Sequence, residues 1–370
     1  MKITTFLTLF LLFGMISFAQ NVNNVKYADM KKVSVRNEIK LPEVMGYQFL
    51  KCDFHMHTIF SDGTVWPSFR VDEAWEEGLD AIAITDHLEN QPSKKYVSGD
   101  HNASYQMALE EAKEKDILLI RGTEITRSMP PGHLNALFLT DANQLIKSSP
   151  IEALEAAKKQ GAFIMWNHPG WKPHQPDSCR WMPLHQELFE KGLINGIEVF
   201  NEQEYYPVAL DWCINRNLTV FSNSDIHGLV SHFYDLKKSH RPMTLVLARD
   251  RSVDCIREAI FDNRTLAYFE NILAGKEDLL KAFFEASVTV KSTGTTDSKK
   301  RELFKITNIS AVPFDLLNKK GEKISFPALT SVVIPLNRND CKEMTVKNLF
   351  SGSKSNLKID LFSQNLAVLK

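Results

Sequence analysis

Two histidines separated by one residue stand out as a possible reactive site. In "DFHMHTIFSDG", residues 53–63, His55 and His57 flank Met56, and Asp62 follows in an Asp-Gly turn. Successive side chains of an extended strand point to opposite faces, so His55 and His57 share one face. Imidazole and carboxylate groups suit Zn²⁺, Mn²⁺ or Fe, and no thiolate is required. An isolated pair of this kind is more often an ordinary core or surface feature, so the pair needs support from elsewhere in the chain.

That support comes from side chains at the ends of other strand-like runs. They are His87 in "LDAIAITDH", Glu124 in "DILLIRGTEIT", His133 at the start of "HLNALFL", His168 in "AFIMWNHPG", and Asp225 and His227 in "LTVFSNSDIH". Six of the 11 histidines and three carboxylates thus lie at strand ends. Without ions, so many imidazoles and carboxylates at one rim would be left unpaired and mutually repelling. Nine ligands are too many for one ion, so the pattern predicts two to three divalent metal ions (Zn, Mn or Fe).

The elements that must position these residues alternate between strand and helix patterns. From about Gln48 to Ala248, eight short apolar runs alternate with amphipathic stretches such as "SPIEALEAAKKQG". Repeated units of this kind are typical of a parallel sheet covered by helices, and their number favours a closed, TIM-like α/β barrel. In such barrels the functional residues lie at the carboxyl ends of the strands.

The pattern changes near the end of the chain. From Ser287 onward, alternating runs such as "ELFKITNIS" and "SVVIPL" are separated by turn residues, which predicts a small antiparallel β-sandwich. We therefore expect a barrel over residues 41–272, a helical linker over 273–286 and a C-terminal β-sandwich-like domain over 287–370.

The first 19 residues have the features of a signal peptide. Lys2 precedes an apolar run, and Ser17 and Ala19 supply small residues before the expected cleavage point. The run is shorter than the roughly 20 residues that a membrane span needs. We expect an exported bacterial protein, periplasmic or extracellular, with no membrane span after cleavage.

Composition narrows the possible partners. The formal net charge is −1, whereas binding of nucleic acid by bulk electrostatics needs a basic excess. The net charge does not exclude a small anionic substrate, because such a substrate needs only a local binding site. The five cysteines are scattered without a CxxC motif, so no cysteine-based zinc site is expected. The sequence leaves the oligomeric state open.

Taken together, the motifs "DFHMHTIFSDG", "AITDH", "GTEIT…GHLNALF", "WNHPG" and "SNSDIHG" resemble those of the PHP (polymerase and histidinol phosphatase) superfamily of metal-dependent phosphoesterases. The resemblance covers about Leu41 to Phe269. It implies a distorted seven-stranded (β/α) barrel with a trinuclear metal centre. It also implies three ligand sets, which are His55, His57, Glu124 and Asp225; Asp62, His87 and His227; and Glu124, His133 and His168, with Glu124 bridging.

Export and a C-terminal β domain are similar to a narrower group, the secreted Sb-PDE-type phosphodiesterases, which implies a small phosphoester substrate. On this hypothesis a hydroxide bridging the first two ions attacks phosphorus, and Asp225 or His227 passes a proton to the leaving group. Arg127, three residues beyond Glu124, is the candidate cation for the phosphate. Trp171, Tyr205 and Tyr206 are candidates for an apolar wall.

Two alternatives remain. A metal-dependent amidohydrolase that cleaves C–N or C–O bonds also begins with two histidines on a strand, but the expected lysine bridge is replaced here by Glu124. A non-catalytic metal-binding barrel that serves the C-terminal domain is the second alternative, and the occupation of every ligand position disfavours it.

Overall fold

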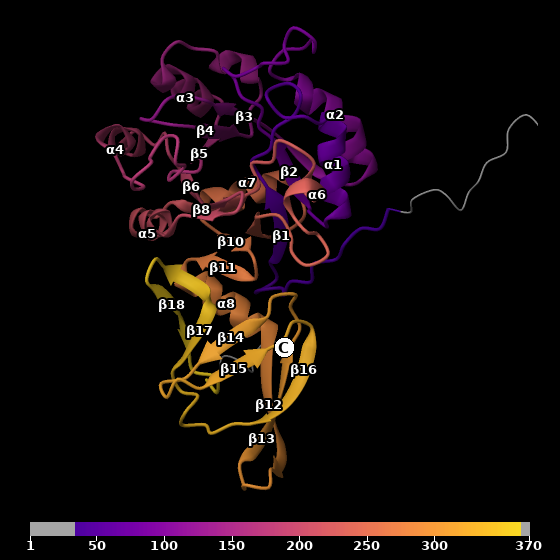
Figure 1. Cartoon of the computed structure of the whole chain (residues 1–370), viewed down its shortest axis with the longest axis vertical. Helices are drawn as coiled ribbons and strands as arrows, with labels where there is room; N and C mark the ends of the chain where they lie inside the picture. The colour runs from indigo at the N-terminus through magenta and orange to yellow at the C-terminus, as the bar shows by residue number, and fades with distance from the viewer. Residues whose placement is uncertain (1–33, 364–370) are drawn as a thin grey trace, which may run out of the picture. The chain divides into compact units, whose positions relative to one another are not determined.

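The computed structural model describes residues 34–363, in which strands and helices first alternate and strands then follow one another (Figure 1). The first strands are β1 (Gln48–Asp53), β2 (Ala81–Ile84), β3 (Leu118–Ile125), β4 (Leu134–Leu137), β5 (Phe163–Trp166), β6 (Gly196–Asn201), β7 (Glu204–Tyr205), β8 (Thr219–Asn223), β9 (Met243–Ala248), β10 (Thr265–Phe269) and β11 (Ile272–Gly275). All eight strand-like runs expected from the sequence contain one of these strands.

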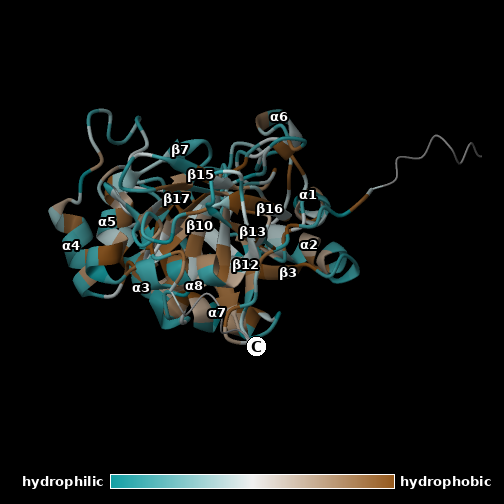
Figure 2. Cartoon of the chain, turned by 90° about the horizontal axis from the view of Figure 1, so that it is seen from below, coloured by the Kyte–Doolittle hydropathy of each residue, from teal (hydrophilic) through white to brown (hydrophobic). Residues whose placement is uncertain are grey.

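Helices separate most of these strands. They are α1 (Pro67–Glu76), α2 (Ala103–Glu114), the 3₁₀ helix η2 (Ala142–Leu145), α3 (Pro150–Lys159), α4 (Pro183–Glu190), α5 (Pro207–Arg216), α6 (Val230–Phe233), α7 (Val253–Phe261) and α8 (Glu277–Ser287). Helix α3 illustrates why they form. The Ser149 hydroxyl accepts a hydrogen bond from the backbone N–H of Glu152, and Ala153, Leu154 and Ala157 form the buried face. The same mixture of hydrophobic and hydrophilic residues is visible along α4 in Figure 2.

The strands form a large mixed sheet in which neighbours run in both directions. Strands β1, β2 and β3 are parallel, as are β5, β6 and β8. Strand β4 is antiparallel to both β3 and β5, and β9 is antiparallel to β1. The expected α/β class is confirmed, but the expectation of a parallel sheet is wrong at β4 and at β9. Only residues 126–133 separate β3 from β4, which is too short for a crossover helix, so the chain must reverse.

Hydrogen bonds join the segments that follow β1 and β8. The backbone N–H of His57 donates to the carbonyl of Ile226 at 3.0 Å, and the N–H of Asp225 donates to the carbonyl of His55 at 2.8 Å. These bonds bring the histidine pair at the end of β1 beside the residues at the end of β8. The closed barrel of seven strands is a more specific expectation than the α/β class, and it stays a prediction.

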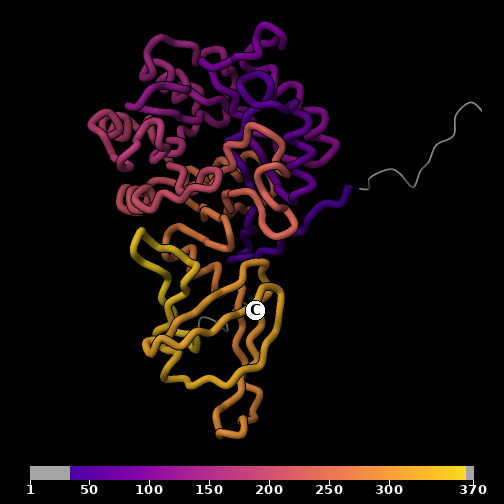
Figure 3. The backbone as a smooth tube through the Cα atoms, viewed as in Figure 1, coloured from indigo at the N-terminus to yellow at the C-terminus, as the bar shows by residue number. Residues whose placement is uncertain are grey.

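After α8, every regular element within the described range is a strand. These are β12 (Val288–Thr296), β13 (Glu302–Asn308), β14 (Phe314–Leu317), β15 (Lys323–Phe326), β16 (Thr330–Pro335), β17 (Met344–Gly352) and β18 (Ser355–Ile359). Strands β12, β13 and β16 form a separate antiparallel sheet, whereas β14, β15, β17 and β18 extend the large sheet through β17, which pairs in parallel with β11. Figure 3 traces this part of the backbone in orange and yellow.

Helix α8 packs against residues from both parts of the chain. The ring of Phe283 lies 5.2 Å from that of Phe49 in β1, and the ring of Phe284 lies 4.9 Å from that of Phe314 in β14. The segment 273–286 therefore contains the end of β11 and most of a buried helix, where the sequence predicts a linker.

The structure contains neither a disulfide nor a membrane-spanning helix among the described residues. All five cysteines are free thiols, Cys179 and Cys341 included. None of the helices among residues 34–363 is long and apolar enough to cross a membrane. The expected signal peptide lies outside the described residues.

Candidate metal centre

The nine candidate ligands gather into three neighbouring groups. Within each group, one side-chain ligand atom per residue lies within 4.8 Å of the others. The groups are His55, His57 and Asp225; His57, Asp62, His87 and His227; and Glu124, His133 and His168. They come from segments that follow β1, β2, β5 and β8, from the end of β3, and from the residue before β4. The antiparallel direction of β4 is what brings His133, at its start, to the same rim.

The first group is the most deeply buried. His55 and His57 are both fully buried, and their Nε2 atoms are 3.1 Å apart. The Oδ1 atom of Asp225 lies 3.1 Å from Nε2 of His55 and 3.0 Å from Nε2 of His57. The implied fourth member, Glu124, is slightly farther away, with Oε1 3.5 Å from Nε2 of His55. The ligand atoms of His55, His57 and Asp225 thus lie close together, and Glu124 could add a fourth.

The second group surrounds Asp62. Its Oδ1 atom lies 3.3 Å from Nε2 of His87 and 3.2 Å from Nε2 of His227. The ring of His57 stacks between them, with centroids 4.3 Å from that of His87 and 4.2 Å from that of His227. The sequence does not assign His57 to this group, and the geometry lets it serve two groups.

The third group surrounds Glu124. The Oε1 atom lies 3.1 Å from Nδ1 of His133 and 3.7 Å from Nε2 of His168. The other oxygen, Oε2, lies 2.5 Å from Nδ1 of His87 in the second group. Glu124 therefore touches members of all three groups, which is the arrangement that a bridging ligand requires.

Buried polar atoms without hydrogen bonds mark places where ions would fit. Among the described residues, eleven buried side-chain nitrogen or oxygen atoms make no hydrogen bond, and four of them are Oδ1 of Asp62, Oε2 of Glu124, Nδ1 of His133 and Oδ1 of Asp225. Buried polar atoms are normally satisfied, so each such atom needs an explanation. All four belong to the three groups. Divalent ions bound by imidazole and carboxylate groups would satisfy them, so the donor set fits the expected ions.

The ionisation of three of the ligands suits bound cations. Burial opposes the charge of Asp225, but His55 holds the pKa of this carboxyl well below its usual range, and His87 does the same for Glu124. Burial and the charge of His87 lower the pKa of His57 to about 4, so this ring is neutral at pH 7 and has a lone pair to offer. Ionised carboxylates and neutral imidazoles are the protonation states that bind metal.

The three groups open into a cavity of about 210 Å³. Its lining residues are Asp62, His87, Asn90, Glu124, Thr126, His133, His168, Trp171, Glu202, Asp225 and His227. Four of them are carboxylates, and none is a lysine or an arginine. Bound cations would offset the charge of these carboxylates and favour the entry of an anionic substrate.

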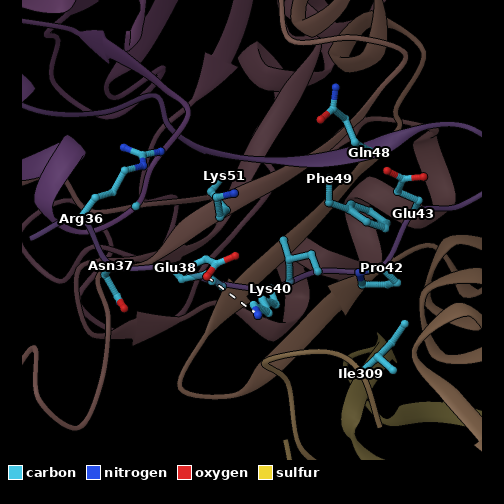
Figure 4. A pocket seen from close by; sticks show the side chains of 13 residues that line it. Arg36, Asn37, Glu38, Lys40, Pro42, Glu43, Gln48, Phe49, Lys51 and Ile309 are labelled. Carbon is cyan, nitrogen blue, oxygen red and sulfur yellow. Dashed lines mark ion pairs between the residues drawn. The ribbon is translucent and has the colours of Figure 1, made fainter. Parts of the chain in front are cut away.

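A larger cavity, of about 400 Å³, lacks these features. It is lined mainly by the segment before β1 and by β1, with Gly78 and Ile309 completing the wall (Figure 4). Its cations are already paired, since Nζ of Lys51 lies 2.7 Å and Nη2 of Arg36 lies 3.6 Å from the carboxylate of Asp80. Size alone therefore does not identify the reactive site of this chain.

Of the other residues expected at the site, some line the small cavity and others lie outside it. Trp171 lines the small cavity as expected, whereas Tyr205 packs on Phe200. The guanidinium of Arg127 is held by Glu89, with Nη2 2.7 Å from Oε1, and it is absent from the cavity lining. Its role as a phosphate-binding cation stays a prediction.

Sequence reasoning missed Glu198, a fully buried residue in β6. Its carboxylate contacts Nδ1 of His55 at 2.9 Å and accepts a hydrogen bond from the backbone N–H of His168 at 2.7 Å. The available signal was a single acidic residue within the apolar run "GIEVFN". A charge in a buried strand must be paired, and such pairs are common behind metal ligands.

Two ligands also have unusual backbone conformations. Asp225 and His168 have φ values of +49° and +26°. Residues other than glycine rarely adopt positive φ, and such strain is concentrated at functional sites. Both side chains are thus directed into the cavity by conformations that the surrounding structure must maintain.

Comparison with known proteins agrees with this geometry. A family model described as the PHP domain matches residues 53–210. A solved structure from Bacteroides vulgatus, described as a two-domain protein containing a predicted PHP-like metal-dependent phosphoesterase, is 42% identical with a TM-score of 0.84. That match covers 88% of this chain and 98% of the other. An uncharacterized protein from Methanocaldococcus jannaschii is 38% identical over 84 residues, which are 22% of this chain and 36% of that protein.

The fold and the site therefore define a hydrolase of the metal-dependent phosphoesterase class. The chain belongs to the family of PHP-like metal-dependent phosphoesterases.

Proposed function

We propose that the chain hydrolyses a small phosphoester, a phosphodiester in preference to a monoester, at a centre of two to three divalent ions. The observation that carries the proposal is the meeting of three ligand groups in one cavity that has four carboxylates and no lysine or arginine in its lining. Bound cations would offset the four carboxylates and attract a phosphate ester. Zn²⁺, Mn²⁺ and Fe all suit the imidazole and carboxylate donors.

The ions, when bound, would supply Lewis acidity toward the phosphoryl oxygens and activate a water molecule. The residues of the chain hold and orient them. Glu124 and His57 are the proposed shared ligands, because each contacts members of more than one group.

Proton transfer to the leaving group is assigned to Asp225 or His227. The side chain of His227 is 34% exposed and lines the cavity, and its Nδ1 lies 2.8 Å from the backbone carbonyl of Asp225. This contact orients the ring so that Nε2 faces the cavity side occupied by Asp62, 3.2 Å away. The ring of His227 reaches solvent, but its Nδ1 faces the carbonyl of Asp225, so His227 could pass a proton only while its Nε2 does not hold an ion.

The experiment is a panel of model substrates tested with purified full-length protein. After removal of metal with a chelator and reloading with Mn²⁺ or Zn²⁺, the protein is expected to hydrolyse bis-p-nitrophenyl phosphate faster than p-nitrophenyl phosphate. It is expected to leave an N-acyl amino acid intact, which separates this function from that of an amidohydrolase. His57→Ala and Asp225→Ala should lose both activity and bound metal, and full activity in either variant would overturn the proposal.

We also propose export from a bacterial cell to the periplasm or beyond, as in the secreted Sb-PDE-type group. The support is the pattern of residues 1–19 in the sequence. Amino-terminal sequencing of the protein from cell fractions tests it. A mature chain that begins at Gln20 outside the cytoplasm is expected, and an uncleaved cytoplasmic chain would refute it.

A further inference from the structure

One acidic residue in the cavity has no place in the three ligand groups. Of the four carboxylates that line the cavity, Asp62, Glu124 and Asp225 belong to the groups, and Glu202 does not. Glu202 lies in the tight turn between β6 and β7. Its role must therefore be sought in something other than direct participation in these groups.

The turn that carries Glu202 is firmly anchored. The backbone N–H of Glu202 donates to the carbonyl of Asn223 at 3.3 Å, and Glu202 has a φ of +48°. The side chain of the preceding residue, Asn201, donates to Glu198 at 2.8 Å and to Oδ2 of Asp225 at 3.3 Å. The base of the Glu202 side chain is thus fixed relative to the candidate ligands.

The Glu202 carboxylate has no direct partner for its charge. Among the described residues, no hydrogen bond or ion pair involves the Glu202 carboxylate. Burial and the nearby negative charge of Asp225 raise its pKa from the ordinary value for glutamate. Glu202 is exposed, so water solvates its charge, but the carboxylate still places a negative charge at the wall of the site, where it repels anions that enter.

We propose that Glu202 is a specificity-determining residue that selects phosphodiesters, which carry one negative charge, against phosphomonoesters. The inference rests on the proposed function and deepens it. Near pH 8 a monoester carries close to two negative charges, so Glu202 repels it more strongly than it repels a diester. For charges several ångströms apart in a partly solvated cavity, this difference corresponds to about five- to tenfold in binding.

A diester also differs from a monoester in having a second alcohol group, which needs a surface to pack against. Trp171 lines the same cavity, and its side chain is 38% exposed. Its ring lies 5.4 Å from the ring of His168 and 5.8 Å from that of His133, measured between centroids. An apolar face beside the third ligand group gives the additional alcohol group of a diester a place to pack, and a monoester has no group to use it.

The test compares the full-length, Mn²⁺-loaded wild type with Glu202→Gln at pH 8. The substrates are bis-p-nitrophenyl phosphate and p-nitrophenyl phosphate, and the measured quantity is the ratio of their kcat/KM values. The matched control is Glu190→Gln, because Glu190 is an exposed residue of α4 outside the cavity. Glu202→Gln is expected to raise kcat/KM for the monoester about fivefold and to leave the diester within about twofold.

The control variant should keep the wild-type ratio. An unchanged ratio in Glu202→Gln would overturn the inference, and so would an equal rise or fall for both esters. An equal fall would show that Glu202 acts in catalysis and does not select by charge.

A binding measurement separates this inference from the proposed function. Calorimetry with the Mn²⁺-loaded proteins compares inorganic phosphate, mostly doubly charged at pH 8, with singly charged dimethyl phosphate. Glu202→Gln should tighten the binding of phosphate about fivefold and that of dimethyl phosphate by less than about twofold. If the wild type hydrolyses neither ester, the proposed function fails and the binding result still decides the role of Glu202. Equal phosphate affinity in both proteins, or no phosphate binding by either, would overturn that role.

Discussion

Glu198 contacts His55 across a gap of 2.9 Å between Oε1 and Nδ1, and both side chains are fully buried. The second carboxylate oxygen of Glu198 accepts the backbone N–H of His168 at 2.7 Å. His55 and His168 belong to different ligand groups, so one carboxylate positions members of two groups. A carboxylate on Nδ1 fixes the proton there and leaves Nε2 free to bind an ion.

Replacing this carboxylate should weaken metal binding without unfolding the protein. Glu198→Gln loses an acceptor for either His55 or His168, and we expect about 10- to 100-fold lower affinity for Zn²⁺. Competition with a chromophoric chelator measures the affinity for Zn²⁺. Glu187→Gln, at an exposed position of α4, is the control and should bind as the wild type does. Unchanged affinity in Glu198→Gln would show that the contact does not position a ligand.

Metal binding should release protons at neutral and mildly alkaline pH. Burial opposes the charge of His87, but Glu124 and Asp62 raise its pKa to about 10, so the ion-free protein carries a proton on this ring at pH 8. An imidazole must be neutral to bind an ion, so binding expels that proton. Affinity should therefore rise with pH between 6 and 9. Calorimetry in two buffers of different ionisation enthalpy counts the protons, and none released at pH 8 would contradict this account.

The centre rests on a buried ion-pair network. The guanidinium of Arg241 is fully buried, with Nη1 3.2 Å from Oδ2 of Asp53 and Nε 3.0 Å from Oε2 of Glu77. Asp53 in turn accepts the backbone N–H of Ser224 at 3.1 Å, beside a candidate ligand.

Arg241→Met would leave both carboxylates buried and unpaired. We expect the free energy of unfolding to fall by about 3–5 kcal/mol, measured by urea denaturation of the metal-free protein. Lys238→Met removes a cation whose side chain is 83% exposed, and it should leave the stability unchanged. A stable Arg241→Met variant would mean that the network is dispensable.

The turn that presents Asp62 depends on Gly63. A Cβ atom at this position would lie 2.6 Å from the carbonyl carbon of His57 and 2.6 Å from the nitrogen of Thr58. Backbone atoms cannot move aside as a flexible side chain can, so Gly63→Ala should displace Asp62. We expect elemental analysis to find about one ion fewer per chain, as for Asp62→Ala. The wild-type metal content in Gly63→Ala would refute this role of the glycine.

The ligands could be predicted from the sequence because most of them follow an apolar run closely, whereas His133 opens one and Asp62 lies in the turn after His57. The two-residue spacing of His55 and His57 places both on one face, and Glu124 and Asp225 end equally clear runs. The three groups then require only that the strand ends meet at one rim, which the α/β pattern implies.

Other features depend on contacts that spacing does not reveal. Glu198 and His55 are 143 residues apart, and nothing local to "GIEVFN" identifies its partner. Arg127 follows Glu124 closely in sequence, but the folding of the loop after β2 brings Glu89 to its guanidinium. Strand β4 reverses direction because no helix lies between Glu124 and His133. This short connection was visible in the sequence, but the apolar pattern of the strands led to the prediction of a parallel sheet.

Anomalous diffraction from crystals grown with Mn²⁺ or Zn²⁺, measured on both sides of the metal's absorption edge, tests the metal centre most directly. We predict two or three anomalous peaks, each within bonding distance of ligand atoms from one of the three groups. Crystals with the metal present but no peak at these groups, or with peaks only elsewhere on the protein, would contradict the assignment.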